Sequence, residues 1–115
     1  MEEMCQPLDF YGSNTYGSPL IKAGADGKVV EVQRPDGFPL TAYYLEMTPE
    51  TLYWTTKLLH ERYQLPIVVT ENGAANCDWV AIDGKVHDPQ RQDLVHRYLR
   101  ELGRAISEGV DIRES

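Results

Sequence analysis

The stretch Ile67–Glu71 reads IVVTE and continues into an Asn72-Gly73 turn. Its first three residues are β-branched and apolar in succession, without the alternation that a half-buried strand shows. Such a run is typical of a strand covered on both faces, as in a parallel sheet flanked by helices. We therefore expect a strand from Leu65 to Thr70, with the carboxylate of Glu71 at its end. In parallel α/β folds this end of the sheet is where active sites lie.

A helix is predicted before this strand. Thr48-Pro49 offers a hydroxyl that can cap free backbone N–H groups, followed by a proline at the first helical position. Apolar and small residues then recur at three- and four-residue spacing, which predicts one buried face and an end near the last of them. These residues are Leu52, Thr56, Leu59 and Tyr63.

A second helix is predicted after the strand. Asn76 to His87 reads as a polar loop, and Asp88-Pro89 then repeats the pattern of a cap followed by proline. Gly109 supplies a left-handed stop. Between them lies a helical stripe made of Leu94, Tyr98, Leu102 and Ile106.

Two further strands complete the predicted order. Leu8 to Tyr16 reads as a short strand leading into a loop, and Val110 to Arg113 as the start of another strand. Gly17 to Glu46 is a long excursion in which Asp26-Gly27 and Asp36-Gly37 mark turns around a small hairpin. The order strand, helix, strand, helix predicts an α/β fold of parallel strand-helix units with right-handed crossovers. So few strands leave unpaired edges, so we expect residues 1–115 to form one partial domain, a piece of something larger.

Composition narrows the range of functions. The 115 residues are 42% apolar and 25% charged, which is ordinary for a globular domain. The net charge of -7 and the scattered lysines and arginines make nucleic acid an unsuitable partner. No apolar run approaches the ~20 residues of a membrane helix and no signal-peptide pattern opens the chain. Cys5 and Cys77 lack the spacing of a zinc or redox site, so free thiols in a cytoplasmic protein are expected.

Glu71 has two candidate partners. Asn14 and Tyr16 follow the first strand, and would lie roughly 5 Å away if the two strands are neighbours. A tyrosine hydroxyl there could donate a hydrogen bond to Glu71 and keep it ionised, as a carboxylate nucleophile requires. The alternative is that Glu71 belongs to a solvated turn, that Asn14 bonds its own backbone and that Tyr16 only packs.

Other titratable residues give weaker signals. His60 and His96 are expected on helix surfaces, and His87 is expected to hold the loop over the second helix start. No group of His, Cys and acidic residues has metal-ligand spacing, and no glycine-rich phosphate loop is present, so neither a metal nor a cofactor is expected.

Four segments resemble family 1 glycoside hydrolases of the β-glucosidase type. LPIVVTENGAA (65–75) and the downstream segment DGKVHDPQRQDLVHRYLRELGRAISEGVDIR (83–113) are similar to the C-terminal part of that family. DFYGSNTY (9–16) resembles its sixth barrel strand and TPETLYWTTKLLHERY (48–63) the helix that follows. The resemblance runs from about Leu8 to Arg113 and implies a partial (β/α)8 TIM barrel, roughly a quarter of the whole.

The resemblance also implies roles for single residues. Glu71 is similar to the family's catalytic nucleophile at the end of strand seven, and Asn14 and Tyr16 match its Asn-x-Tyr element. Tyr16 would then bond the nucleophile and Asn14 would lie close to the sugar. Glu46 matches the segment leading into helix six, but Leu45 replaces the usual tryptophan, so no sugar contact is assigned there.

The implied reaction is retaining hydrolysis of β-glucosides or related oligosaccharides. It needs a second carboxyl about 5 Å from the nucleophile, acting as acid and then as base. In the family that group lies in an Asn-Glu-Pro segment, which this chain lacks. We therefore expect a fragment with the nucleophile and very weak activity. The alternative is a non-catalytic barrel piece that self-associates or docks onto a complementary fragment through its exposed strand edges.

Overall fold

Three parallel strands form the sheet that carries the candidate site. A computed structural model describes residues 6–114 and places β1 (Tyr11–Asn14), β4 (Ile67–Glu71) and β5 (Ile112–Glu114) in the order β1-β4-β5. Both pairs run parallel, with Ile67 opposite Tyr11 on one side and opposite Ile112 on the other. The carboxyl ends of β1 and β4 therefore meet at one edge, as predicted.

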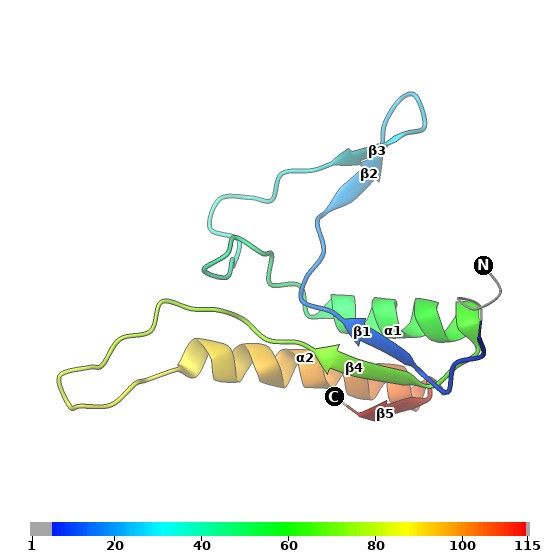
Figure 1. Cartoon of the computed structure of the whole chain (residues 1–115). Helices are drawn as coiled ribbons and strands as arrows, with labels where there is room; N and C mark the ends of the chain where they lie inside the picture. Colours follow the sequence, from blue (N-terminus) through cyan, green and yellow to red (C-terminus); the bar gives the residue numbers. More distant parts are fainter. Residues whose placement is uncertain (1–5, 115) are drawn as a thin grey trace.

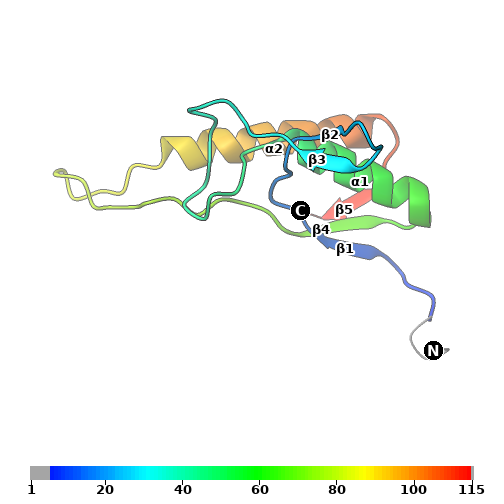
Figure 2. The ribbon, with the colours of Figure 1, turned by 90° about the horizontal axis from the view of Figure 1, so that it is seen from above.

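Two helices make the crossovers between these strands. α1 (Glu50–Tyr63) joins β1 to β4 and α2 (Pro89–Ser107) joins β4 to β5. The two helices pack side by side, and Figures 1 and 2 show both of them on the same face of the sheet. The prediction of parallel strand-helix units is confirmed.

The core lies between the sheet and the helices. Ile67 and Val69 point into it from β4, whereas Val68 between them is only partly buried. The expectation that β4 is covered on both faces is therefore wrong for the described residues, because both helices cover the same face. The buried apolar side chains are Leu52, Tyr53, Ile67, Val69, Leu94, Tyr98, Leu102, Ala105 and Val110.

The starts of the two helices differ in how they are capped. Asp88 accepts a hydrogen bond from the Arg91 N–H (3.3 Å), and Pro89 is the first residue of α2, as expected. The Thr48 hydroxyl does not cap α1. It instead accepts from the N–H of Ser18 (2.9 Å) and shares a proton with the Thr51 hydroxyl (2.8 Å).

The buried stripes are shifted slightly from their predicted positions. Tyr63 is 45% exposed and Ile106 is 51% exposed, while Tyr53 and Ala105 are buried. The reason is geometric: Ala105 can approach closely where a larger side chain could not, and Tyr63 instead stacks on Tyr11 at the sheet edge (ring centroids 5.1 Å apart).

A left-handed residue follows each helix. After α2 it is Gly109, with a φ of 93°, as its position predicts, but after α1 it is Gln64, with a φ of 55°. A glutamine in this conformation is uncommon. Its side chain donates to the carbonyl of Glu61 (2.8 Å), which supplies a partner for one free carbonyl at the helix end.

The long excursion after β1 carries the predicted hairpin. β2 (Ile21–Ala23) pairs antiparallel with β3 (Val29–Glu31), and Gly27 takes a φ of 76° in the turn between them. Figure 1 shows this hairpin standing off α1, with the loop between β4 and α2 extending in another direction. The radius of gyration is 17.4 Å, against about 13 Å for a compact domain of this length.

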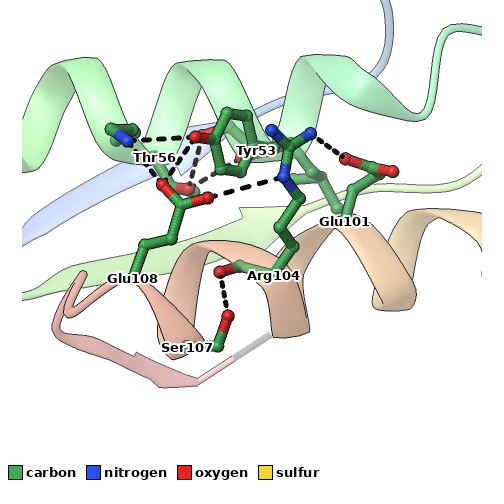
Figure 3. Close-up of polar contacts among 8 residues, drawn as sticks. Tyr53, Thr56, Glu101, Arg104, Ser107 and Glu108 are labelled. Atoms are coloured by element: carbon green, nitrogen blue, oxygen red, sulfur yellow. Dashed lines mark hydrogen bonds and ion pairs between the residues drawn. The ribbon is translucent and has the colours of Figure 1, made fainter.

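A polar cluster ties the C-terminal end of α2 to α1 (Figure 3). Glu108 accepts hydrogen bonds from Lys57 Nζ (2.5 Å) and the Tyr53 hydroxyl (2.7 Å). The Arg104 guanidinium lies 3.9 Å from the centre of the Tyr53 ring and 3.6 Å from Glu108. The hydrogen bond from Lys57 lowers the pKa of Glu108, and the same bond raises the pKa of Lys57.

Two remaining observations concern the membrane and the thiols. Across residues 6–114, neither helix combines the length and the apolar character that a bilayer crossing requires.

Cys77 is exposed and free, whereas Cys5 lies outside the described residues.

Candidate active site

Glu71 lies at the carboxyl end of the central strand, with its side chain exposed. The Tyr16 hydroxyl donates a hydrogen bond to Glu71 Oε2. That bond raises the pKa of Tyr16, and partial burial and the charge of Glu71 act in the same direction. The arrangement leaves one oxygen of the carboxylate, Oε1, for other chemistry.

Asn14 lies beside Glu71 because the strand register shifts. The shift between Ser13 and Asn14 brings Asn14 opposite Glu71 rather than opposite Thr70. The Asn14 amide oxygen accepts a hydrogen bond from the Thr70 hydroxyl (2.6 Å). Asn14 therefore bonds across the two strands, and not its own backbone as the alternative reading of the sequence had it.

The backbone after β1 is held against β4. The Thr15 N–H donates to the Glu71 carbonyl (2.9 Å), and the Asn72 side chain donates to the Thr15 carbonyl (2.7 Å). Thr15 itself is buried. Asn72 thus fixes the loop that presents Tyr16, a role that its position in an Asn-Gly turn did not indicate.

Tyr98 reaches the same loop from α2. Its hydroxyl donates to the carbonyl of Tyr16 (2.5 Å) and accepts from the N–H of Thr48 (3.1 Å). The helical stripe predicted its burial. Nothing in the sequence indicated its hydroxyl partners, which lie on two other segments.

A cleft opens beside the Glu71 carboxylate. It has a volume of about 530 Å³, and its polar lining comes from Tyr16, Thr70, Glu71 and Asn72. Its apolar lining includes Val95 and Leu99 of α2. A larger cleft of about 710 Å³ lies between residues 39–47 and 76–90.

The histidines take part in local structure. His60, which was expected on a helix surface, is partly buried, and its Nδ1 lies 2.9 Å from the Leu65 carbonyl. His87 Nε2 pairs with Asp83 (2.8 Å) in the loop before α2, and His96 is exposed. Within residues 6–114, no three His, Cys, Asp or Glu side chains gather as metal ligands would.

Comparison with known proteins places the chain in a family. The model of Glycosyl hydrolase family 1 matches residues 1–114. The chain belongs to this family. Its membership rests on the whole length of the match, and the Tyr16–Glu71 contact lies inside it.

Several members of glycosyl hydrolase family 1 are similar over nearly the whole chain. Beta-glucosidase A of Thermotoga maritima is 40% identical over 98% of this chain and 26% of that protein. A bifunctional beta-D-glucosidase/beta-D-fucosidase of Bifidobacterium breve is 36% identical over 94% of this chain and 27% of its own length. This family 1 chain therefore spans about a quarter of the relatives that it matches.

A solved family 1 structure has the same fold. The Thermotoga maritima beta-glucosidase in complex with glucoimidazole superposes with a TM-score of 0.86 at 39% identity, over 98% of this chain and 26% of that one. The strand-helix arrangement described above therefore corresponds to about a quarter of that structure.

Proposed function

We propose that this chain carries the nucleophile side of a retaining β-glucosidase site. The observation that carries the proposal is the hydrogen bond from Tyr16 to Glu71 at the carboxyl end of a central parallel strand. β-Glucosidase names among the relatives favour a terminal β-D-glucosyl substrate. The fold would be about a quarter of a (β/α)8 barrel, with β1 and β4 as neighbouring barrel strands.

The chemistry follows from the two oxygens of Glu71. Tyr16 holds Oε2, so Oε1 attacks the anomeric carbon as the bond from that carbon to the leaving oxygen breaks. The leaving oxygen takes a proton from an acid. Water then attacks the glycosyl ester and gives its proton to the same group acting as base, which regenerates the carboxylate and releases the sugar.

Asn14 is proposed to contact the sugar. Its amide oxygen is oriented by Thr70, which leaves the amide NH₂ as the group that can donate to a hydroxyl. Asn14 and Glu71 are opposite one another across the strand pair, so both can reach the same sugar ring.

The acid/base group must come from outside this sequence. No Asn-Glu-Pro segment occurs in the chain, which spans 26% of the Thermotoga maritima relative. Loss of acid/base assistance typically lowers a rate by about 10² to 10⁴. We therefore expect the 115-residue chain alone to hydrolyse glucosides very slowly.

A mechanism-based label tests the proposal. A 2-deoxy-2-fluoro-β-glucoside with a good leaving group needs little acid assistance and leaves a stable ester on the nucleophile. We expect a mass increase of one fluoroglucosyl group, mapped to the peptide that contains Glu71. The Glu71→Gln variant is the control and should remain unlabelled.

Two results would contradict the proposal. Labelling on another residue would remove Glu71 from the role of nucleophile. Absence of labelling, while a complete family member reacts in the same tube, would mean that this chain has no working glucose site.

A second candidate function is supported by the open face of the sheet. Both helices cover one face of the sheet only (Figure 2), and Val68 of β4 is only partly buried, whereas Ile67 and Val69 on either side of it are buried. A second copy of the chain, or a complementary barrel fragment, could cover the open face and pair with the sheet edges. Such association is the alternative to catalysis by the chain on its own.

A further inference from the structure

We propose that Tyr98 is a positioning residue for the nucleophile, because it fixes the backbone of Tyr16. Tyr98 lies on α2, far from β1 in the sequence, and it does not contact Glu71 itself. Its catalytic consequence rests on the function proposed above, whereas its effect on Tyr16 does not.

The Tyr98 hydroxyl makes one hydrogen bond as a donor and one as an acceptor, both with main-chain atoms. It donates its proton to the Tyr16 carbonyl (2.5 Å) and accepts from the Thr48 N–H (3.1 Å). A single phenol therefore joins α2, the loop after β1 and the segment before α1. Removal of its oxygen would leave the Tyr16 carbonyl and the buried Thr48 N–H without these partners.

Burial keeps this phenol in the donating form. The Tyr98 side chain is only 2% exposed and belongs to the core cluster that contains Leu52 and Val69. Its burial raises the pKa of the phenol, so the hydroxyl stays protonated through the neutral range.

The held carbonyl belongs to the residue that bonds the nucleophile. The carbonyl and the side chain of Tyr16 share one Cα, so fixing the peptide plane limits where the Tyr16 hydroxyl can point. The neighbouring ties, from Asn72 to Thr15 and from Ser18 to Thr48, act on other residues of the loop. Tyr98 is the one described side chain that bonds the main chain of Tyr16 itself.

The test uses the Tyr98→Phe variant and the titration of Tyr16. The hydrogen bond to Glu71 raises the pKa of Tyr16, so that pKa reports the bond. We expect the pKa of Tyr16, followed by NMR of ¹³C-labelled tyrosine and assigned with Tyr16→Phe, to fall in Tyr98→Phe toward its value in Glu71→Gln.

Tyr53→Phe is the matched control. Tyr53 is also 2% exposed on a helix, and its hydroxyl also bonds a residue that is distant in sequence, but this residue is Glu108. Loss of the Tyr53 hydroxyl in Tyr53→Phe should leave the pKa of Tyr16 unchanged. An unchanged Tyr16 pKa in folded Tyr98→Phe would overturn the inference, as would an equal fall in both variants.

Two further measurements separate this inference from the proposed function. If the chain labels at Glu71, Tyr98→Phe should slow labelling about tenfold relative to Tyr53→Phe, and equal rates would contradict positioning. If the chain does not label, only the proposed function fails, because the Tyr16 titration needs no substrate. Should Tyr98→Phe not fold, the unsubstituted chain must show a slowly exchanging Tyr98 hydroxyl proton close to Tyr16, and rapid exchange would overturn the inference.

Discussion

Gly17 follows the tyrosine that contacts Glu71, and it lies against the backbone of a distant segment. A Cβ at this position would come within 2.2 Å of the Glu46 carbonyl oxygen, a distance that no side chain can occupy. Its φ lies outside the left-handed region, so the need for glycine here is one of space and not of conformation. Small size at residue 17 allows the loop to pass Glu46 and present Tyr16.

We predict that Gly17→Ala destabilises the chain by about 1–3 kcal/mol, as overpacking of a tight site usually does. Gly103→Ala is the matched control. A Cβ there meets nothing within 4 Å, and alanine in a helix is favoured over glycine by about 1 kcal/mol. Urea unfolding measures both variants. Equal stability of the two would contradict the close packing of Gly17 on Glu46.

At the scale of single residues, the sequence indicates which residues belong to the candidate site better than it indicates which atoms they bond. Glu71, Asn14 and Tyr16 could be proposed because the ends of parallel strands meet at one edge of a sheet. Tyr98 and Asn72 could not. Helical periodicity predicts that Tyr98 is buried, and the Asn-Gly pair predicts a turn at Asn72, but neither signal shows which main-chain atom the side chain bonds.

At the scale of elements, the two helices are joined by the cluster around Glu108. Its carboxylate receives Lys57 and Tyr53 from α1, while Arg104 approaches from its own helix. The pKa of Glu108 is lowered in the folded chain, so the ionised form is the one that favours folding. This contribution is present above the ordinary glutamate pKa of about 4.3 and is lost as the pH falls through the lowered value.

We predict that Glu108→Gln lowers the free energy of unfolding at pH 7, and that the gap to the unsubstituted chain closes as the pH falls through the lowered pKa of Glu108. Once Glu108 is protonated, it resembles glutamine. Glu61→Gln, on the exposed side of α1, is the control and should give a small, constant difference. Denaturant titrations across the acid range would decide, and a gap that persists in acid would show that Glu108 acts by packing alone.

The elements themselves follow from local sequence where the signal is local. Asp88-Pro89 and Gly109 delimit α2 as expected. The Asp88 side chain, the Pro89 ring and the missing Cβ of Gly109 each affect only the adjacent turn of the helix. The prediction that the Thr48 hydroxyl caps α1 is wrong, because this hydroxyl accepts a hydrogen bond from Ser18, a residue of another segment. Gln64 has no local signal for its left-handed conformation.

At the scale of the whole molecule, both helices cover one face of the sheet, and no helix of residues 6–114 covers the other. We predict that the chain self-associates at micromolar concentration and that Val68→Lys, on the open face, weakens this association at least tenfold, or about 1.4 kcal/mol. Ile106→Lys replaces an apolar residue that is 51% exposed on α2 and should leave association unchanged. Sedimentation velocity over a concentration series measures both. A monomer at every concentration would contradict the second candidate function.

The strand order also decides how the sheet can form. β4 is the central strand, and each of its partners is reached only through a loop and a helix, so the sheet contains no local hairpin. Long loops must therefore close before any of its ladder hydrogen bonds can form, which is characteristic of slow folding. Of these three strands β1 is synthesised first, and its pairing with β4 must wait until β4 has left the ribosome. The backbone that carries Asn14 therefore precedes its β4 neighbours in synthesis by the whole of α1 and the segments on either side of it.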